Sequence, residues 1–572
     1  MEPLRKNVLR EAWAIARPYW SSEDKWRARG LLATIIVLTL GAVALDVRLN
    51  SWRGDFYNAL QNYDEGEFFK QIGIFALLAG IWIVCRVYAR YLNQMLQIRW
   101  RRWLTEQYVD RWLGNRTYYR LQLTSQGTDN PDQRISEDLN QFCVGTLGLG
   151  LDLLNSVVTL LSFMVVLWDI SGPLALPLGP LGTVTIPGYL LWLALLYAIA
   201  GTWATVKLGQ PLVRLNFFQQ RYEADFRFSL VRLRENAESI AFYGGEPREK
   251  DVFRSRFARV FDNFWGLMQQ TKRVGWLTSG YAQAAVVFPY LAVAPRYFAK
   301  AIDLGKMMQI AGAFDAVQGA LSYIVSSYTD IAQWQSVVAR LAGFRQRMEE
   351  IEADLAKPQP IEIETDGGDA LSVQGLDLDL PDGRPLRQGV ALTAEPGSAT
   401  LVTGPSGAGK STLLRAIAGL WPFGRGRIRR PAGRALFLPQ KPYIPLGTLR
   451  HALLYPATGE GDTGRLKGAL EAVGLGAYAD QLDVDDNWPM RLSLGEQQRL
   501  AFARTLLAEP EIVFLDEATS ALDEPSEDAL YRLLRDAPWR PTLVSVGHRS
   551  TLRAFHDRVL DVTEEKPAPV PA

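Results

Sequence analysis

The stretch ATLVTGPSGAGKSTLLRAIAGL, residues 399–420, decides the fold of the C-terminal half of this 572-residue chain. An apolar β-type run leads into a Gly-rich loop that opens into a helical pattern, the context that G-x4-G-K-[ST] requires. Such a loop binds phosphates through backbone N–H groups and the helix N-terminus. We therefore predict that Lys410 reaches the β- and γ-phosphates of ATP and that Ser411 binds Mg²⁺. The predicted phosphate-binding residues are Gly404, Pro405, Ser406, Gly407, Ala408, Gly409, Lys410, Ser411 and Thr412.

A second apolar run, IVFLDEATS at 512–520, ends in two carboxylates. From Ala370 onward such runs alternate with helical patterns, which predicts an α/β domain with a parallel sheet. Buried parallel strands carry functional groups at their C-terminal tips. Alone, an Asp-Glu pair is an ordinary strand end. Beside a phosphate loop, Asp516 is predicted to hold Mg²⁺ and Glu517 to orient and polarise the attacking water.

The N-terminal part is dominated by apolar runs. A helix needs roughly 20 apolar residues to cross a membrane. Two runs meet that length without a charge, at 186–206 and 274–295, and three shorter ones lie at 30–45, 71–85 and 153–168. A sixth, 307–333, contains Asp315 and Asp330 and fails a hydropathy criterion alone. It suits a helix that lines a polar cavity, although a buried helix of a soluble domain is the alternative.

The overall composition averages these two unlike halves. The chain has 62 Lys+Arg and 61 Asp+Glu, a net charge of +1, which argues against a nucleic-acid binder and an acidic disordered chain. Two cysteines are too few for a disulfide framework or a four-thiolate zinc site. Three histidines leave few ligands for other metal sites.

Charge placement predicts the orientation in the membrane. Basic residues gather in the first 29 residues and after the second apolar run, which places both on the cytoplasmic side. Tryptophans among the first charges predict an interfacial helix against membrane lipids, and no signal-peptide pattern is present. Ionisable residues inside spans are candidates for a transport pathway, with a paired structural charge or a place outside the bilayer as the alternatives for each. They are Arg86, Asp152, Arg296 and Asp315.

The stretch LSLGEQQR at 492–499 resembles the signature LSGGQQR of ABC-type ATPases, and FLPQ, SALD and SVGH resemble that family's Q-, D- and H-loops. The resemblance implies a head-to-tail dimer in which ATP lies between one chain's phosphate loop and the other chain's signature. Ser493 and Gly495 would then contact the γ-phosphate. The implied catalytic residues are Glu517, His548 and Gln440, and the implied Mg²⁺ ligands are Ser411, Gln440 and Asp516.

Three positions depart from the family pattern. Leu494 and Glu496 replace Gly and Gln in the signature. Leu380 stands where the family usually has an aromatic residue that stacks on adenine. We therefore expect loose base selectivity, with GTP tolerated.

Four long stretches, at 128–142, 186–198, 215–246 and 404–426, match one group of transporters closely. By these stretches the chain resembles the bacterial SbmA/BacA group over nearly its whole length; the YddA- and BclA-like members of that group carry a fused ATPase and are related to the peroxisomal ABCD half-transporters. The resemblance implies a six-span α-helical transmembrane domain of the ABC exporter type, in a domain-swapped homodimer, with an α/β P-loop nucleotide-binding domain. The expected boundaries are an interfacial helix at 1–29, the membrane domain with two cytoplasmic coupling connections at 30–340, a linker at 341–360, the nucleotide-binding domain at 361–563 and a disordered tail at 564–572.

By the same resemblance, we expect ATP-driven import of peptides, such as antimicrobial or bleomycin-like compounds, and other bulky hydrophilic compounds across a bacterial inner membrane. The alternatives are a lipid, acyl-CoA or drug exporter and a corrinoid importer. DNA-repair and ribosome-associated ATPases carry similar motifs, but they lack membrane spans.

Overall fold

The computed structural model describes residues 8–124, 130–177, 183–365 and 370–562; the predicted tail 564–572 lies outside them. The chain divides into two compact units. The first comprises Met1–Gly114 and Asp129–Arg347, and the second comprises Asn115–Thr128 and Met348–Ala572.

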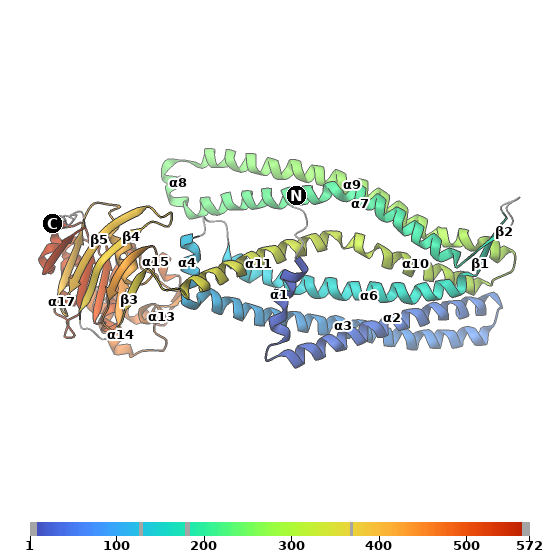
Figure 1. Ribbon diagram of the computed structural model, residues 1–572, viewed down its shortest axis with the longest axis horizontal. Helices are drawn as coiled ribbons and strands as arrows, with labels where there is room; N and C mark the ends of the chain where they lie inside the picture. Colours follow the sequence, from blue (N-terminus) through green and yellow to red (C-terminus); the bar gives the residue numbers. More distant parts are fainter. Residues whose placement is uncertain (1–7, 125–129, 178–182, 366–369, 563–572) are drawn as a thin grey trace, which may run out of the picture. The chain divides into compact units, whose positions relative to one another are not determined.

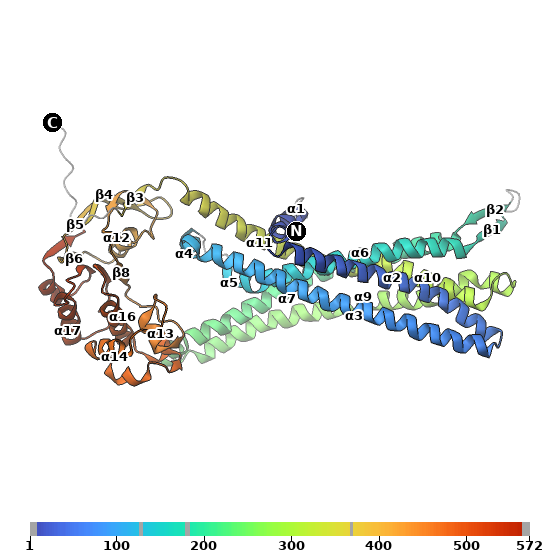
Figure 2. The same ribbon diagram turned by 90° about the horizontal axis from the view of Figure 1, so that it is seen from below.

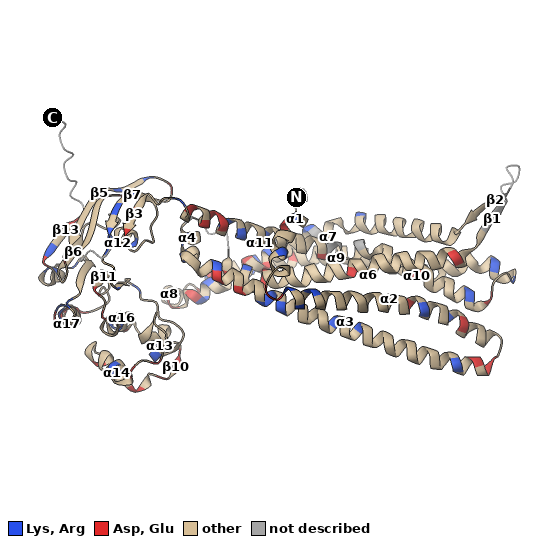
Figure 3. Cartoon of the chain, turned by 60° about the horizontal axis from the view of Figure 1, so that its bottom comes forward, with Lys and Arg blue, Asp and Glu red and all other residues tan. Residues whose placement is uncertain are grey.

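The first unit is a bundle of long helices (Figure 1). Charged residues are sparse along much of α6 and α10 and gather toward α8 and α11 (Figure 3). The second unit includes α4 and parts of η1 and α11. The elements up to residue 355 are α1 (Val8–Trp20), α2 (Lys25–Gln61), α3 (Glu65–Leu113), η1 (Gly114–Arg116), α4 (Thr117–Thr124), α5 (Pro131–Gln133), η2 (Arg134–Asp138), α6 (Leu139–Ser171), β1 (Pro173–Pro177), β2 (Thr183–Pro187), α7 (Tyr189–Glu235), α8 (Ala237–Tyr243), α9 (Glu246–Phe298), α10 (Leu304–Ser326) and α11 (Tyr328–Leu355).

Five helical segments among the described residues are long and apolar enough to cross a membrane. They contain α2, α3, α6, α7 and α9, and so carry the five predicted charge-poor runs. The run predicted from residue 186 enters its helix only at Tyr189, because Pro187 ends β2 and Gly188 adopts a left-handed φ of 63°. The sixth predicted run is divided between α10 and α11 and is not among the five, as its two aspartates led us to expect.

Buried polar contacts fix the packing of the bundle at one point. Asp138 is 1% exposed, and its carboxylate pairs with Arg134 at 2.7 Å and with Arg340 of α11 at 2.6 Å. Nearby, Trp334 donates its indole N–H to Thr146 at 2.9 Å. These bonds tie the start of α6 to α11. The charge of Arg134 is therefore paired with Asp138 inside the helical unit.

The second unit contains a five-stranded sheet in the order β13-β6-β12-β11-β8, all parallel, and a four-stranded sheet in the order β3-β7-β4-β5. The runs β6, β11 and β12 are almost entirely buried, as expected for parallel strands covered on both faces. The strands are β3 (Ile361–Glu364), β4 (Leu371–Asp379), β5 (Pro385–Ala394), β6 (Ala399–Thr403), β7 (Gly424–Arg429), β8 (Ala435–Leu438), β9 (Gly447–Thr448), β10 (Asp485–Asp486), β11 (Ile512–Asp516), β12 (Thr542–Val546) and β13 (Arg558–Asp561).

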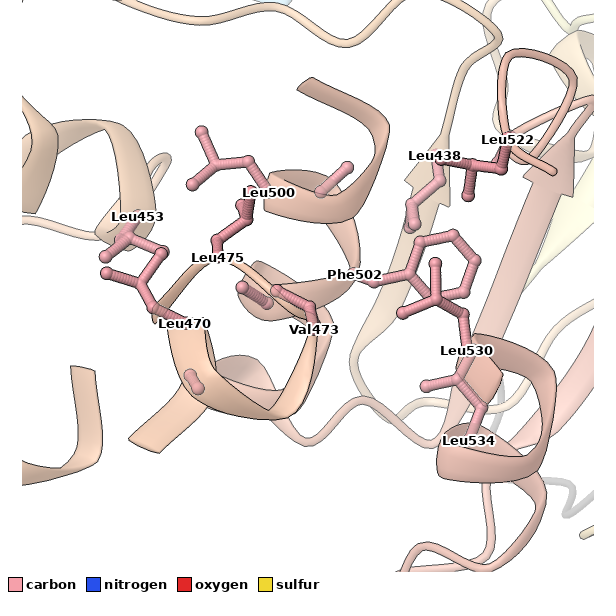
Figure 4. Close-up of a cluster of buried hydrophobic side chains, with 14 of the residues drawn as sticks. Leu438, Leu453, Leu470, Val473, Leu475, Leu500, Phe502, Leu522, Leu530 and Leu534 are labelled. Atoms are coloured by element: carbon pink, nitrogen blue, oxygen red, sulfur yellow. The ribbon is translucent and has the colours of Figure 1, made fainter. Parts of the chain in front are cut away.

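Helices alternate with these strands along the chain. They are α12 (Lys410–Ile417), α13 (Leu449–Leu454), α14 (Thr463–Ala472), η4 (Gly476–Gln481), α15 (Trp488–Arg491), α16 (Leu494–Ala508), α17 (Glu524–Arg535) and η5 (Ser550–Phe555). Figure 4 shows Phe502 of α16 beside Leu438 of β8 and Leu530 of α17, all in one buried cluster. This apolar contact holds α16 against the strand ends where the site lies.

Candidate nucleotide site

Four neighbouring strands of the parallel sheet deliver the predicted site residues to one edge. The phosphate loop follows β6, Gln440 follows β8, Asp516 ends β11, and His548 follows β12. In a parallel sheet all carboxyl ends point the same way, so residues as far apart in sequence as Gly404 and His548, 144 positions, meet there. This is the edge where open α/β sheets bind ligands.

The phosphate loop has the backbone that its glycines permit. Gly404, Gly407 and Gly409 have φ values of 144°, 81° and 85°, and Gly409 leads directly into α12. Lys410 is 6% exposed and donates to the carbonyls of Gly404 and Pro405 at 2.8 and 2.9 Å. Burial lowers the pKa of Lys410, while the carboxylates of Glu517 and Asp516 oppose that shift. The lysine is thus held inside the loop that it is predicted to serve.

Ser411 and Asp516 form a pair suited to a hard cation. The Ser411 hydroxyl donates to Oδ1 of Asp516 at 2.8 Å. Burial raises the pKa of Asp516, and the neighbouring Glu517 raises it further against the hydrogen bond from Ser411. Hydroxyl and carboxylate oxygens are ligands that Mg²⁺ prefers, and Mg²⁺ in such sites takes its other ligands from phosphates and water. In the described part of the chain no group of three His, Cys, Asp or Glu side chains is arranged to hold a metal ion. The residues fit Mg²⁺ brought with a nucleotide.

Glu517 is held from two sides. Gln440 donates its Nε2 to Oε2 of Glu517 at 3.1 Å, and Nε2 of His548 lies 3.2 Å from Oε1. The residue adopts a φ of 49°, a left-handed conformation that is rare for glutamate, and its N–H donates to the carbonyl of Val546 at 3.0 Å. The structure therefore brings together all three predicted catalytic residues, with the carboxylate aimed by its neighbours.

The signature residues are organised by a capping box. Ser493 caps α16, its hydroxyl lies 2.7 Å from Oε2 of Glu496, and its own N–H donates to the same oxygen at 2.9 Å. Tyr478 donates to the other oxygen of Glu496 at 3.0 Å. Burial would raise the pKa of Glu496, but the bonds from Ser493 and Tyr478 outweigh it and the pKa lies below its ordinary value. The departure at position 496 thus keeps a capping role.

Ser493 and Gly495 are not brought to the phosphate loop of their own chain by any hydrogen bond among the described residues. Gly495 instead lies against the D-loop: a Cβ there would stand 3.2 Å from the carbonyl of Ala521. This arrangement leaves the signature available to another ligand or chain.

Two positioning groups escaped the sequence reasoning. Gln498 is fully buried; its Nε2 donates to the Gln440 carbonyl at 2.8 Å and its Oε1 accepts from the N–H of Ala521 at 3.0 Å. It therefore ties the Q-loop to the D-loop. The second glutamine of LSLGEQQR was its only signal in the sequence.

Glu527 is the second missed group. It is 1% exposed and accepts from Thr519 and Thr551, both at 2.7 Å, while Arg549 lies at 3.4 Å. Arg549 also donates to the Leu522 carbonyl at 2.8 Å. The D-loop and the segment after His548 are thereby joined through one buried carboxylate. From the sequence alone, a glutamate on an amphipathic helix is expected to be exposed, so nothing in the pattern indicated that Glu527 is buried.

Leu380, the expected base-contact position, begins a tight turn. Its N–H donates to the Arg384 carbonyl at 2.8 Å, and the N–H of Gly383 donates back to Leu380 at 2.9 Å. The side chain is partly exposed.

The four ionisable candidates in the helical unit separate in the structure. Arg86 and Asp152 line one cavity between α2, α3 and α6. Arg296 donates to the carbonyl of Ser171 at the end of α6, and Asp315 is exposed on α10. Only the first two remain together as members of a possible site.

Comparison with known proteins gives matches over both units. The family "ABC transporter transmembrane region 2" matches residues 15–298, and "ABC transporter" matches residues 387–520. Among curated relatives, "ABC transporter D family member 2, chloroplastic" of Arabidopsis thaliana is 36% identical, over 98% of this chain and 87% of the relative. "Inner membrane ABC transporter ATP-binding protein YddA" of Escherichia coli is 32% identical, over 96% of each chain.

Two further matches bear on function and fold. "Lysosomal cobalamin transporter ABCD4" of Homo sapiens is 31% identical, over 95% of this chain and 92% of the relative. Among solved structures, a bacterial Atm1-family ABC exporter with ATP bound superposes with a TM-score of 0.71 at 18% identity, over 93% of this chain and 94% of that one. The last match shows the fold alone. The predicted helical transmembrane domain with a fused P-loop ATPase domain is confirmed.

Proposed function

The chain belongs to the ABC transporter family, with a membrane domain and an ATPase domain in one polypeptide, and on that premise we propose that it imports peptides and other bulky hydrophilic compounds across a bacterial inner membrane. ATP hydrolysis drives transport in this family. The convergence of Lys410, Ser411 and Glu517 at the edge of one sheet supports assigning the chemistry to this chain.

We assign roles by geometry. The phosphate loop and Lys410 bind the β- and γ-phosphates of ATP, the substrate of this site. Ser411 and Asp516, with Gln440, hold Mg²⁺, which neutralises phosphate charge when bound. Glu517 orients and polarises the attacking water, and Gln440 and His548 aim its carboxylate.

One nucleotide-binding domain per chain makes this a half-transporter, so two chains assemble. We propose a homodimer, with Ser493 and Gly495 of one chain completing the ATP site of the other. The capping box supports this role because it fixes the Ser493 side chain at the N-terminus of α16, where a helix favours phosphate.

Peptide import rests on the resemblance to the SbmA/BacA group and on the charged cavity in the membrane domain. A corrinoid is the second candidate solute, because one relative of nearly full coverage is named a lysosomal cobalamin transporter. Export of a lipid or an apolar drug is disfavoured by the placement of Arg86 and Asp152 on a shared cavity, since a pathway for apolar solutes has little need of charged side chains. Export of an acyl-CoA, whose headgroup is charged, stays the alternative.

Expression in a bacterium that lacks its own peptide uptake system tests this function. We expect the intact protein to sensitise the cells to bleomycin, and Glu517→Gln, which lowers ATP hydrolysis by about 10²–10⁴-fold, to leave them resistant. Equal sensitisation by both proteins would show that hydrolysis does not drive uptake. If neither sensitises, peptide import is wrong, and uptake of cobalamin by the same cells tests the second candidate.

A further inference from the structure

A cavity of about 770 Å³ is lined by residues of α2, α3 and α6. These three helices contact one another in the membrane unit, and Figure 2 shows their ribbons. Apolar side chains from all three helices form part of its wall. Its polar and aromatic lining includes Trp82, Arg86, Arg90, Asn93, Asp152 and Asn155. The volume and the mixed lining are those of a ligand pocket.

The charges on this wall are only partly matched. Arg86 lies 3.3 Å from Asp46, which also accepts the indole N–H of Trp82 at 2.8 Å. Arg90 and Asp152 are exposed, and neither makes a hydrogen bond or an ion pair with any residue that the structure describes. Arg90 therefore has no ionic partner among the described residues, and Asp152 has only the more distant charge of Arg86 opposite it, which Arg86 already shares with Asp46.

Three buried polar atoms of the lining also lack a partner within the described chain: Nε of Arg86 and the Oδ1 atoms of Asn93 and Asn155. Buried polar atoms are normally hydrogen-bonded, and a buried group left without a bond destabilises the protein. The missing partner must supply one acceptor and two donors. An amide group offers both kinds.

This wall is unsuited to lipid. Ionisable side chains within a membrane face a water-filled cavity or a partner because hydrocarbon does not solvate charge. Arg90 and Asp152 have opposite signs and come from different helices, α3 and α6. A molecule that carries both charges satisfies the two together.

We propose that this cavity binds the transported solute, and that the solute is zwitterionic and amide-bearing, as a short peptide is. Its anionic group binds Arg90, its cationic group binds Asp152, and its backbone amides bond Asn93, Asn155 and Nε of Arg86. This inference rests on the proposed peptide import and deepens it by naming the residues that select the solute.

A terminal-charge series tests the assignment. Three forms of one pentapeptide of alanine and proline, with free termini, N-acetylated and C-amidated, are titrated calorimetrically against the full-length protein in lipid nanodiscs. We expect each blocked terminus to weaken binding about tenfold, as loss of one charged hydrogen bond does. Arg90→Gln should then bind the free and C-amidated forms equally, and Asp152→Asn the free and N-acetylated forms equally.

Arg48→Gln and Asp169→Asn are the matched controls, because both are exposed charges, on α2 and α6, that do not line the cavity. They should keep the full discrimination of the unaltered protein. If the two cavity variants also keep it, the cavity is not the solute site, although peptide uptake stands.

The other outcomes are equally distinct. Failure of the unaltered protein to bind any of the three peptides would overturn the inference. Lower dimer content of both cavity variants in native mass spectrometry, with unchanged peptide binding, would show that the wall contacts a second copy and would also overturn it. Charge-matched binding without ATP-driven uptake would uphold the site and refute peptide import.

Discussion

Asp516 illustrates how one carboxylate is adapted to a cation. Its partial burial and the adjacent Glu517 both disfavour its ionised form, so its pKa is raised. Such a group binds a proton more readily in the folded than in the unfolded chain. It therefore lowers stability at pH values above its raised pKa, and that penalty disappears as pH falls toward the ordinary value. Under the proposed role of Asp516, this instability accompanies the ionised carboxylate that Mg²⁺ would require.

Asp516→Asn should consequently abolish Mg²⁺-dependent hydrolysis and yet raise the thermal midpoint of the full-length protein at neutral pH. The gain should shrink as the pH is lowered, which thermal unfolding followed at several pH values measures. Asp377→Asn is the control of opposite sign: Arg425 and the Gly389 N–H lower the pKa of Asp377, so its removal should destabilise at neutral pH. A lower midpoint for Asp516→Asn at neutral pH would contradict the argument.

Leu380 stands at the position where we expect contact with the nucleotide base, and its side chain is therefore expected to set base selectivity. A leucine offers no π-face, whereas stacking of a base on an aromatic side chain contributes about 1–3 kcal/mol. We expect GTP and CTP to compete with ATP in binding to the unaltered protein, and Leu380→Tyr to tighten binding of all three. Nucleotide competition assays measure this, with Leu380→Met as the control for side-chain volume. Strong preference of the unaltered protein for ATP would contradict loose selectivity.

At the scale of elements, α16 and α17 position loops that they do not contain. Gln498 of α16 reaches the Q-loop and the D-loop, and Glu527 of α17 reaches the D-loop and the segment that carries His548. Both side chains are buried, so their hydrogen bonds have no competition from water. The two helices thereby hold in place the loops around Glu517.

Glu527→Ala should remove the acceptor shared by Thr519 and Thr551, at a cost of about 1–3 kcal/mol for each buried donor left unsatisfied. We expect a lower thermal midpoint together with slower ATP hydrolysis at saturating ATP. Glu524→Ala, at an exposed position in the first turn of the same helix, should change neither. Normal hydrolysis by Glu527→Ala would show that the carboxylate does not position His548.

At the scale of the whole molecule, the proposed ATP site needs two chains. The signature cap at Ser493 makes its hydrogen bonds with Glu496, and no bond among the described residues joins it to the phosphate loop. A head-to-tail dimer brings the signature of one chain to the loop of the other. Each chain then contributes half of two sites.

Two inactive variants should therefore complement each other. Lys410→Ala and Ser493→Ala should each hydrolyse ATP poorly alone, whereas co-expressed mixed dimers contain one site with both elements intact. We expect mixed dimers, purified through two different tags, to recover a substantial part of the activity. Mixed dimers as inactive as either parent would argue against the shared site.

The sequence by itself determined the chemistry of the nucleotide domain and the existence of the membrane domain. The phosphate loop, Gly404 to Ser411, needs glycines at fixed spacing so that its backbone N–H groups can approach phosphate. Long charge-free runs are stable only in lipid or when buried in protein. These constraints are local in the chain, so pattern alone reveals them. The roles of Asp516 and Glu517 could be predicted as well, because two carboxylates at the end of a buried strand are typical of a nucleotide site when a phosphate loop is also present.

Tertiary structure alone decided what lies far apart in sequence. The carboxylate of Glu517 is aimed by Gln440 and His548 because their strands are neighbours in the sheet, and Glu527 is buried because α17 packs over the loops. In the membrane unit, four ionisable residues were indistinguishable as candidates until helix packing placed Arg86 and Asp152 on one cavity and Arg296 against Ser171. Strand order and helix packing depend on many weak contacts summed over the fold, which no short motif encodes.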